Sequence, residues 1–303
     1  MKLAMVARVC PICGSTDGRV FAAENFDPEK WDAFAFASRK LPEYMHYRLV
    51  ECAKCDLVYA NPGPDGVILE DAYREAAYDS SEEACCAART YAGFLPSFKA
   101  RLPSHRAALD IGAGDGAFVE QLLAAGFSEP VGIEPSTAPI EAARPDIRPR
   151  LRQGLFDPGD FAARSFSLIT CFQTVEHLAD PGSVLKQIYG LLEEGGAIFV
   201  VCHNRRALSA RILGLKSPIF DIEHLQLFSP QSIRCGLESS GFTEVSVQTV
   251  RNRYPLRYWS RLLPFPARVK GPLLTFLGRS RLGSMQVSLP AGNIAAIGFK
   301  PPG

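Results

Sequence analysis

Two cysteine pairs stand near the start of the sequence, and their spacing is typical of a metal site. Cys10-Pro-Ile-Cys13 and Cys52-Ala-Lys-Cys55 each place two thiols on a tight turn, from which both sulfurs can reach one ion at about 2.3 Å. Four thiolates complete a tetrahedral set with no open position, so a bound zinc ion would be structural. The sequence therefore predicts a small zinc-ribbon-like module within residues 1–65.

The alternative for these cysteines is two CxxC redox sites, but neither pair stands at a strand-to-helix junction. The interval between the pairs is longer than in most zinc ribbons, while Gly14 and Asp56 follow the pairs as turn-forming residues. The other cysteines show no metal spacing, and the two in apolar runs are expected in the core. These five are Cys85, Cys86, Cys171, Cys202 and Cys235.

The segment LDIGAGDG at residues 109–116 has the glycine pattern of a nucleotide-binding turn. Gly112, Gly114 and Gly116 follow an apolar strand at alternate positions, where they allow a tight turn and a close approach of a ligand to the main chain. The next helix presents free N–H groups there. The spacing is GxGxG rather than the dinucleotide pattern GxGxxG, and Asp110 before it would repel a pyrophosphate but suits the ammonium group of a methionine moiety.

Glu134 closes the next apolar strand, in the segment VGIEPS at residues 131–136. A doubly wound fold places at this position the carboxylate that binds ribose hydroxyls. A glycine turn needed only for packing would not explain this acid. The glycines and the two acids together therefore predict a nucleoside site.

Three histidines stand where catalytic groups gather. Glu223 and His224 are neighbours in a loop ahead of a helix that Ser229 would cap, and they are the first candidates for a general base. His203 follows an apolar strand, and His177 lies in the segment VEHLADP. The alternative is that each histidine only satisfies backbone groups. The remaining two of the five histidines are His46 and His105.

Strand-like runs, glycine turns and helical segments alternate from residue 107 onward. This order predicts a doubly wound α/β fold with a mainly parallel sheet covered by helices on both faces. The predicted strands are 107–111, 131–134, 167–172, 197–202, 243–250 and 293–299, and the predicted helices are 117–125, 137–143, 181–192 and 229–239. We expect a zinc-binding module over residues 1–65, a helical connector over 66–103, the nucleoside-binding domain over 104–250, and a basic lid segment with a final strand over 251–303.

The composition is that of a globular protein, with 47% hydrophobic and 21% charged residues among 303. No apolar run is long enough to cross a bilayer, and no stretch of signal-peptide length precedes the first cysteines, so we expect a cytoplasmic protein. The formal net charge is +1, yet no acid follows Glu244 while nine Lys and Arg do. This basic end favours an anionic partner, or it is a solvated basic face.

Four segments in order resemble the class I S-adenosylmethionine-dependent methyltransferases: LDIGAGDG at 109–116, VGIEPS at 131–136, LITCFQTVEHLADP at 168–181 and LLEEGGAIFVV at 191–201. The resemblance covers roughly residues 100–250 and implies S-adenosylmethionine as the cofactor. By that resemblance Asp110, Gly112 and Gly114 line its methionine end, with Gly116 in the same segment. Glu134, followed by Pro135, holds the ribose, Asp157 lies near the adenine, and Gln173 lies beside the cofactor.

The four-cysteine module, together with Glu-His ahead of Phe-Ser, resembles the deoxysugar C-methyltransferases of antibiotic pathways, in which that pair sits at the sugar. Their long C-terminal domain has no counterpart in this sequence, which leaves both C- and O-methylation open. The ending resembles methyltransferases of bacterial surface-polysaccharide pathways. Arginines among aromatic residues over 251–281 suit a phosphorylated or nucleotide-linked sugar, a lipid-linked glycan, or peripheral contact with a membrane.

Two other functions stay open at this point. Zinc ribbons and basic aromatic segments also serve RNA methyltransferases, although residues 1–61 are not strongly basic, so we do not expect a nucleic-acid partner. The other alternative is a catalytically silent scaffold that uses the zinc module to dock a partner. Acids at both Asp110 and Glu134 argue against the loss of cofactor binding.

Overall fold

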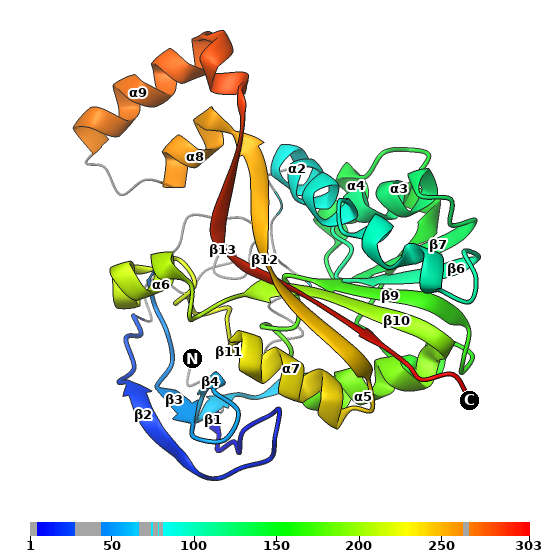
Figure 1. The fold of residues 1–303 in the computed structure, drawn as a ribbon. Helices are drawn as coiled ribbons and strands as arrows, with labels where there is room; N and C mark the ends of the chain where they lie inside the picture. Colours follow the sequence, from blue (N-terminus) through cyan, green and yellow to red (C-terminus); the bar gives the residue numbers. More distant parts are fainter. Residues whose placement is uncertain (1–4, 28–43, 67–73, 75–77, 79–80, 263–266) are drawn as a thin grey trace.

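The structure is a computed structural model that describes residues 5–27, 44–66, 74, 78, 81–262 and 267–303. A seven-stranded sheet lies at its centre, in the order β12-β13-β10-β9-β6-β7-β8 (Figure 1). Strands β6 to β10 run parallel, and β13 pairs antiparallel with both β10 and β12. The strands are β6 (Ala107–Ile111), β7 (Glu129–Glu134), β8 (Leu151–Gln153), β9 (Phe166–Phe172), β10 (Leu192–His203), β12 (Thr243–Pro255) and β13 (Gln286–Phe299). The predicted doubly wound, mainly parallel sheet is confirmed.

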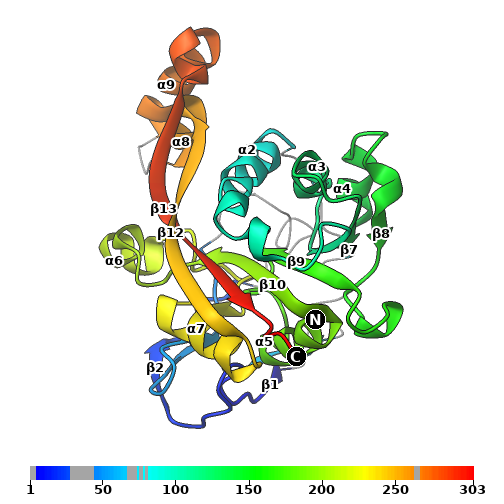
Figure 2. The same ribbon diagram turned by 45° about the vertical axis from the view of Figure 1, so that its right-hand side comes forward.

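Helices cover both faces of this sheet (Figure 2). Buried side chains of α5 (Pro181–Leu191) and α7 (Pro230–Ser239) pack on one face, and those of α2 (Ser81–Ala92) and α3 (Ala117–Ala124) pack on the other. A further helix, α4 (Thr137–Ala142), contacts β7 and β8. Short 3-10 helices are η2 (Leu95–Ser97), η3 (Lys99–Arg101), η4 (Arg148–Arg150), η5 (Pro158–Asp160), η6 (Gly214–Lys216) and η7 (Arg281–Ser284).

Strand β10 is a continuous apolar run in the sequence because both of its faces are buried. Val200 and Cys202 belong to the core on one face, and Phe199 and Val201 belong to the core on the other. Successive strand residues point to opposite faces, so a strand that is covered on both sides must be apolar throughout. The strand begins at Leu192, earlier than the predicted 197, and its pairing with β9 is irregular between Leu192 and Ala197, where Gly195 and Gly196 lie.

Side-chain caps fix where two of the helices begin. The Asp180 carboxylate accepts a hydrogen bond from the Ser183 N–H at 3.0 Å, ahead of Pro181 in the first turn of α5. Ser229 caps α7 in a capping box with Ser232, as the sequence predicts. Such caps satisfy the free N–H groups of the first helical turn.

The N-terminal residues form a second, four-stranded sheet in the order β11-β4-β3-β2. Its strands are β2 (Gly18–Ala22), β3 (Leu49–Cys52), β4 (Val58–Ala60) and β11 (Gln226–Leu227), and β1 (Met5–Val6) pairs with β5 (Gly63–Pro64) beside it. Strand β11 comes from the segment after β10, far along the chain. Side chains of residues 219–227 also share one buried core with β3 and β4. The cysteine-containing sheet is therefore built together with the larger domain.

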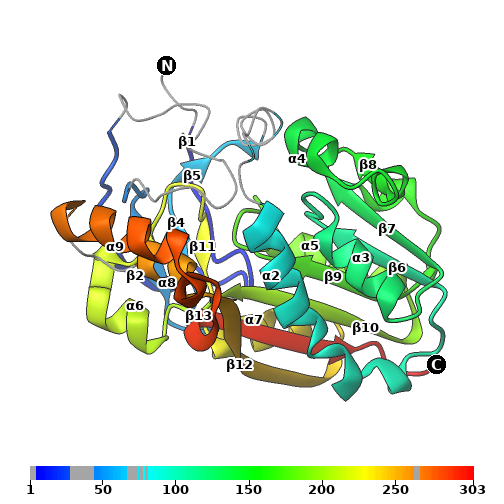
Figure 3. The same ribbon diagram turned by 90° about the horizontal axis from the view of Figure 1, so that it is seen from above.

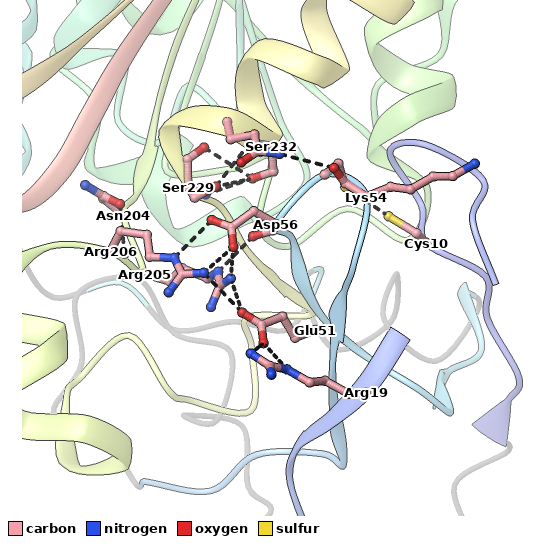
Figure 4. A network of polar contacts seen from close by, with 12 residues as sticks. Cys10, Arg19, Glu51, Lys54, Asp56, Asn204, Arg205, Arg206, Ser229 and Ser232 are labelled. Atoms are coloured by element: carbon pink, nitrogen blue, oxygen red, sulfur yellow. Dashed lines mark hydrogen bonds and ion pairs between the residues drawn. The ribbon is translucent and has the colours of Figure 1, made fainter. Parts of the chain in front are cut away.

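Four charged residues connect this sheet to the segment that follows β10 (Figure 4). The buried Arg205 side chain lies 2.5 Å from Glu51 Oε1 and also pairs with Asp56. Arg206 contacts the same two carboxylates. Burial opposes ionisation of Glu51, but hydrogen bonds from Arg205 and Arg19 hold the pKa of Glu51 below its ordinary value. The pKa of Asp56 is lowered against its burial by hydrogen bonds from Arg206 and Ser229 and by the charge of Arg205. These ion pairs attach the turn after β3, at residues 52–56, to the larger domain.

The two last strands carry an arm away from the sheet. His203 at the end of β10 pairs with Asn293, and β13 begins seven residues earlier at Gln286. Strands β12 and β13 therefore extend past the carboxyl end of β10 as a two-stranded ribbon that carries α8 (Leu256–Leu262) and α9 (Ala267–Arg279). Figure 3 shows these helices and α6 (Leu208–Leu213) on the side of the molecule opposite α3 and α4. This arm occupies the segment that the sequence predicts as a basic lid.

Three of the predicted segments are described only in part: residues 1–4 and 28–43 of the zinc-binding module and residues 263–266 of the lid segment lie outside the described residues. Within the predicted connector, residues 67–73, 75–77 and 79–80 lie outside the described residues, and α2 forms its second half. No helix in the described ranges combines the length and the apolar character that a membrane span requires.

We expect Arg205→Ala to lower the free energy of unfolding by about 3 kcal/mol, because it leaves the buried Glu51 carboxylate without its main partner. Arg206→Ala is the matched control: it contacts the same acids, but its side chain is 53% exposed against 3% for Arg205, so it should cost less than about 1 kcal/mol. Urea unfolding at neutral pH measures both. Equal losses would contradict this role.

The same pair of variants also predicts a pH dependence. The folded pKa of Glu51 and of Asp56 is depressed, so their contribution is complete above the unfolded values near 4 and is lost as the pH falls through the lower folded values. The stability gap between wild type and Arg205→Ala should therefore shrink in acid. A gap that stays constant down to about pH 3 would contradict the ionic origin.

Candidate active site

The carboxyl ends of the parallel strands meet at one edge of the sheet, and the predicted site residues follow them. The glycine turn follows β6, Glu134 ends β7, Gln173 follows β9 and His203 ends β10. Crossover connections return each parallel strand in the same direction, so these ends gather although they are distant in sequence. Ligands in open α/β sheets bind at this edge.

The three glycines of the turn have different reasons to be glycine. All three adopt positive φ values, from 56° at Gly114 to 76° at Gly116. A Cβ on Gly112 would lie 2.2 Å from Thr174 Oγ1, and one on Gly116 would lie 2.6 Å from Ile147 Cγ2. A Cβ on Gly114 would meet no atom within 4 Å. Packing therefore requires Gly112 and Gly116, whereas Gly114 borders open space at the carboxyl edge.

Glu134 lies directly against this turn. Its two carboxylate oxygens accept hydrogen bonds from the N–H of Gly114 at 2.9 Å and of Ser136 at 3.0 Å. Burial raises the pKa of Glu134 above its ordinary value, although both hydrogen bonds favour the ionised form. The end of β7 and the middle of the glycine turn thus form one small polar surface.

Asp110 lies beneath the turn rather than in the open. Its side chain is buried, and its Oδ1 accepts a hydrogen bond from the Thr170 hydroxyl at 2.6 Å. Burial raises the pKa of Asp110 to about 7, against the opposing effect of Thr170, and the nearby Glu134 carboxylate also raises it. A cation held above the turn would favour its ionised form.

The other predicted cofactor residues lie along the same edge. Gln173 adopts φ 51°, and its Nε2 is buried with no hydrogen-bond partner in the described part of the chain. Pro135 is half-buried directly after Glu134. Asp157 is exposed and caps η5, where it accepts a hydrogen bond from the Gly159 N–H at 2.8 Å. A buried donor without an acceptor is costly, so Gln173 stays a candidate for contact with a bound ligand.

The structure gathers the three predicted histidines into one cluster around His224. The ring centroids of His177 and His203 lie 4.9 Å and 4.8 Å from that of His224. The carboxylate of Glu223 lies 3.7 Å from Nε2 of His224. The end of β10 and two separate loops therefore bring together a basic group with an adjacent acid.

Each ring of this cluster is held through Nδ1. His224 Nδ1 lies 2.9 Å from the Ile219 carbonyl, His177 Nδ1 lies 3.0 Å from the Glu223 carbonyl, and His203 Nδ1 lies 2.9 Å from Asn293 Oδ1. These oxygens can only accept, so the neutral rings carry their proton on Nδ1. The lone pair then lies on Nε2, which is the nitrogen that can take up a proton.

Sequence reasoning missed Glu176, which precedes His177 in the VEH segment. Its buried Oε1 accepts the backbone N–H of His203 at 3.1 Å, and its backbone oxygen accepts the N–H of Leu225 at 2.9 Å. Burial raises the pKa of Glu176 to about 7. One residue thus connects the three segments that carry the histidines. Its position directly before His177, a candidate site residue, is the signal that could have identified it.

The four predicted cysteines also come together. Their sulfur atoms all lie within 4.8 Å of one another, with Cys10 and Cys55 at 3.4 Å and Cys13 and Cys52 at 3.5 Å. Zinc–sulfur bonds of about 2.3 Å at tetrahedral angles separate sulfurs by about 3.8 Å, so the donor set fits one zinc ion. Among the described residues, no other group of three or more His, Cys, Asp or Glu side chains meets the same distance.

The cysteine-containing sheet supports the loop that carries Glu223 and His224. Strand β11 begins two residues after His224 and pairs with β4. The N–H of Ala60, at the end of β4, donates to the carbonyl of Leu225 at 2.8 Å. Ile219, Ile222 and Leu225 pack into the core of this sheet. The loop therefore rests between the cysteine-containing sheet on one side and Glu176 on the other.

Known proteins that are similar to this chain include ubiquinone biosynthesis O-methyltransferases. The ubiquinone biosynthesis O-methyltransferases of Actinobacillus pleuropneumoniae serotype 5b (strain L20) and Hahella chejuensis (strain KCTC 2396) are 32% identical over 109 residues and 31% identical over 120 residues. These matches cover 32% and 37% of this chain and 45% and 48% of those proteins. The chain thus spans about half the length of the curated relatives that it matches.

Solved structures with a similar backbone include a SAM-dependent methyltransferase from Archaeoglobus fulgidus, with 17% identity and a TM-score of 0.48 over 78% of this chain and 100% of that chain. Phosphoethanolamine N-methyltransferase 2 from Haemonchus contortus, in complex with S-adenosyl-L-methionine, has 16% identity and a TM-score of 0.45 over 80% of this chain and 63% of that chain.

The family assignment rests on the region that contains the glycine turn, Glu134 and all three histidines of the cluster. Residues 81–247, more than half of the chain, match the family model described as a methyltransferase domain. This chain therefore belongs to the methyltransferase domain family.

Proposed function

We propose that this protein transfers a methyl group from S-adenosylmethionine to a small-molecule acceptor. The observation that carries the proposal is the meeting of two sites at one sheet edge: the Gly114 and Glu134 surface that suits a nucleoside, and the histidine cluster that suits proton removal. A silent scaffold would need the first site but not the second.

The cofactor-binding residues fit S-adenosylmethionine by their chemistry. Glu134 supplies the carboxylate for the ribose hydroxyls, and Pro135 follows it. The open side of Gly114, with Gly112 and Gly116 shaping the turn, lets the methionine end approach the main chain, while the charge of Asp110 acts on its ammonium group from beneath. In this proposal Asp157 lies at the adenine end, and Gln173 lies beside the sulfonium.

Gly114→Ala should weaken cofactor binding while costing the fold only about 1 to 2 kcal/mol, because the added methyl group fills the open side of the turn without meeting protein atoms. Gly126→Ala is the matched control. Gly126 also has a positive φ, 93°, and open space around its Cβ position, but it follows α3 at the other end of that helix.

Titration calorimetry with S-adenosylmethionine compares the two variants. We expect at least a tenfold weaker affinity for Gly114→Ala and wild-type affinity for Gly126→Ala. Equal affinity of both variants, or the absence of binding to the wild type, would remove the cofactor assignment.

The histidine cluster supplies the base for the transfer. When bound, S-adenosylmethionine supplies a methyl group whose bond to sulfur breaks as the acceptor bonds to its carbon, and the sulfur leaves as a neutral thioether. Nε2 of His224 takes the proton of the acceptor, and the Glu223 carboxylate at 3.7 Å stabilises the resulting imidazolium. His177 and His203 flank that ring, and in this proposal the acceptor binds beside them.

His224→Gln should lower kcat by about a hundredfold or more, because Gln cannot accept the proton, while S-adenosylmethionine affinity stays unchanged. His105→Gln is the control, since His105 lies outside the cluster and its Nε2 contacts the Lys99 carbonyl at 3.0 Å. Single-turnover rates with labelled cofactor measure both variants. Unchanged turnover in His224→Gln would exclude it as the base.

A phosphorylated acceptor, such as a nucleotide-linked sugar or a lipid-linked glycan, suits the surroundings of this edge. Nine Lys and Arg and no acid follow Glu244. Large apolar side chains also stand exposed on α6 and α9, with Ile212 73% and Phe276 59% accessible. Basic and apolar side chains together favour peripheral contact with an anionic lipid surface. A cytoplasmic location, where thiols stay reduced, suits the free cysteines.

The acceptor is found by incubating extracts with the enzyme and methyl-labelled S-adenosylmethionine and separating water-soluble, lipid and RNA fractions. Label on a sugar phosphate or a lipid-linked sugar supports the proposal, and its position on carbon or oxygen follows from mass spectrometry. Label confined to RNA, with binding that weakens steeply with salt, would favour the RNA methyltransferase instead.

The four thiols hold a structural zinc ion in this proposal. Four sulfur donors leave no open coordination position, so the metal stabilises the fold instead of activating water. Its effect on activity passes through the contact of β4 with β11, which supports the His224 loop.

Cys52→Ser should remove one zinc ion per chain and lower both stability and kcat, because the sheet that supports the His224 loop loses its cross-link. Cys235→Ser is the control, because Cys235 lies outside the cluster. Metal analysis and thermal unfolding measure the two variants. The absence of zinc from the wild-type protein purified in zinc-containing medium would contradict the assignment.

A further inference from the structure

A hydrogen-bonded chain of buried amides ends on His203. Asn293 lies opposite His203 in the pairing of β13 with β10, and its Oδ1 is 2.9 Å from Nδ1 of the ring. The Asn293 Nδ2 in turn donates to Asn252 Oδ1 at 3.3 Å. The two asparagines are 8% and 2% exposed, and buried polar side chains are costly unless they are satisfied. Their cost here is offset by contacts with each other and with the histidine.

We propose that Asn293 is a positioning residue, which fixes the tautomer and orientation of His203 beside His224. This inference rests on the proposed function only in so far as His203 serves catalysis, since the relation between Asn293 and the ring is a property of the protein itself.

The strand register makes this arrangement specific. The pairing of β12 with β13 shifts between Val250 and Asn252, and Val250 is paired with Asn293. Asn252 itself is paired with Leu289, so its side chain reaches Asn293 across this irregularity and not as its strand partner. With the Asn293 amino group facing Asn252, its oxygen faces the ring and accepts the Nδ1 proton. His203 then presents the lone pair of Nε2.

The remaining groups near His203 determine how it responds to pH. The ring of His224 lies at 4.8 Å, and the Glu176 carboxyl accepts the backbone N–H of His203. Glu223 and Asp221 lie in the loop of His224. The strands β12 and β13 contribute the neutral Asn252 and Asn293 on the Nδ1 side. A carboxylate at position 293 would be the only new charge in direct contact with Nδ1.

Two substitutions distinguish positioning from simple packing. Asn293→Asp keeps the shape and the acceptor, but its negative charge stabilises the protonated ring, so the midpoint of the His203 titration should rise by about one unit. Asn293→Leu removes the acceptor, so the neutral ring should move to a mixture of Nδ1–H and Nε2–H forms. In the wild type we expect the Nδ1–H form.

Nitrogen and carbon NMR of the histidine rings reads these states directly, because the chain has only five histidines. The His203 signals are assigned by their loss in His203→Gln. His105 is the internal standard: its Nε2 contacts the Lys99 carbonyl, so its neutral ring carries the opposite tautomer, and its signals should not change in either variant.

Kinetics add a second measurement. Asn293→Leu should lower kcat about tenfold with unchanged affinity for S-adenosylmethionine, and Asn293→Asp should shift the acid limb of the pH profile upward. An unchanged His203 tautomer in Asn293→Leu together with an unchanged midpoint in Asn293→Asp would overturn the proposal. If the NMR changes occur as expected but no acceptor is methylated, the positioning role stands and the proposed function fails.

Discussion

The direction of the parallel strands is the constraint on which the site depends. Strands β6, β7, β9 and β10 all end at one edge because every connection between them crosses back over a face of the sheet. Residues from four distant parts of the chain, from the glycine turn to His203, therefore meet in space although they are far apart in sequence. The helices that form these crossovers bury both faces, and this burial fixes the strands tightly enough to hold polar groups at the edge.

The cysteine-containing sheet extends this arrangement on one side. It receives β11 as its fourth strand and packs residues of the 217–228 loop into its own core. The ion pairs of Arg205 and Arg206 with Glu51 and Asp56 add a second attachment, directly after β10. A loop that lies outside the main sheet is thus held from two sides, which explains how a buried histidine can keep a defined orientation there.

The central fold could be predicted because its strands are buried on both faces. The apolar runs at 107–111 and 167–172 coincide within one residue with β6 and β9, and the GxGxG turn follows from the glycine spacing. Strand β11 has two residues, Gln226 and Leu227, and its pairing with β4 is a tertiary contact that leaves no periodic pattern in sequence. The same holds for α6. It also holds for the early start of β10, where Leu192 pairs with β9 ahead of the two glycines.

The site was predictable in its parts but not as a whole. Spacing and residue type identified the cysteines, Glu134 and the three histidines one by one. Their convergence required the topology, since His203 ends β10 whereas His177 and His224 lie in two different loops. Glu176 and Asn293 escaped because their roles depend on burial and cross-strand register, which only coordinates reveal. The resemblance to sugar-pathway methyltransferases and the roles of the individual site residues stay predictions.

The ribbon formed by β12 and β13 allows the segment at its tip to change in length. Helices α8 and α9 hang between two strands that are already paired at the sheet, so the chain enters and leaves the tip at fixed, adjacent points. Lengthening or replacing a segment closed in this way adds little entropy cost, which grows only with the logarithm of its length. The tip can therefore change in length with little effect on the stability of the sheet that carries it.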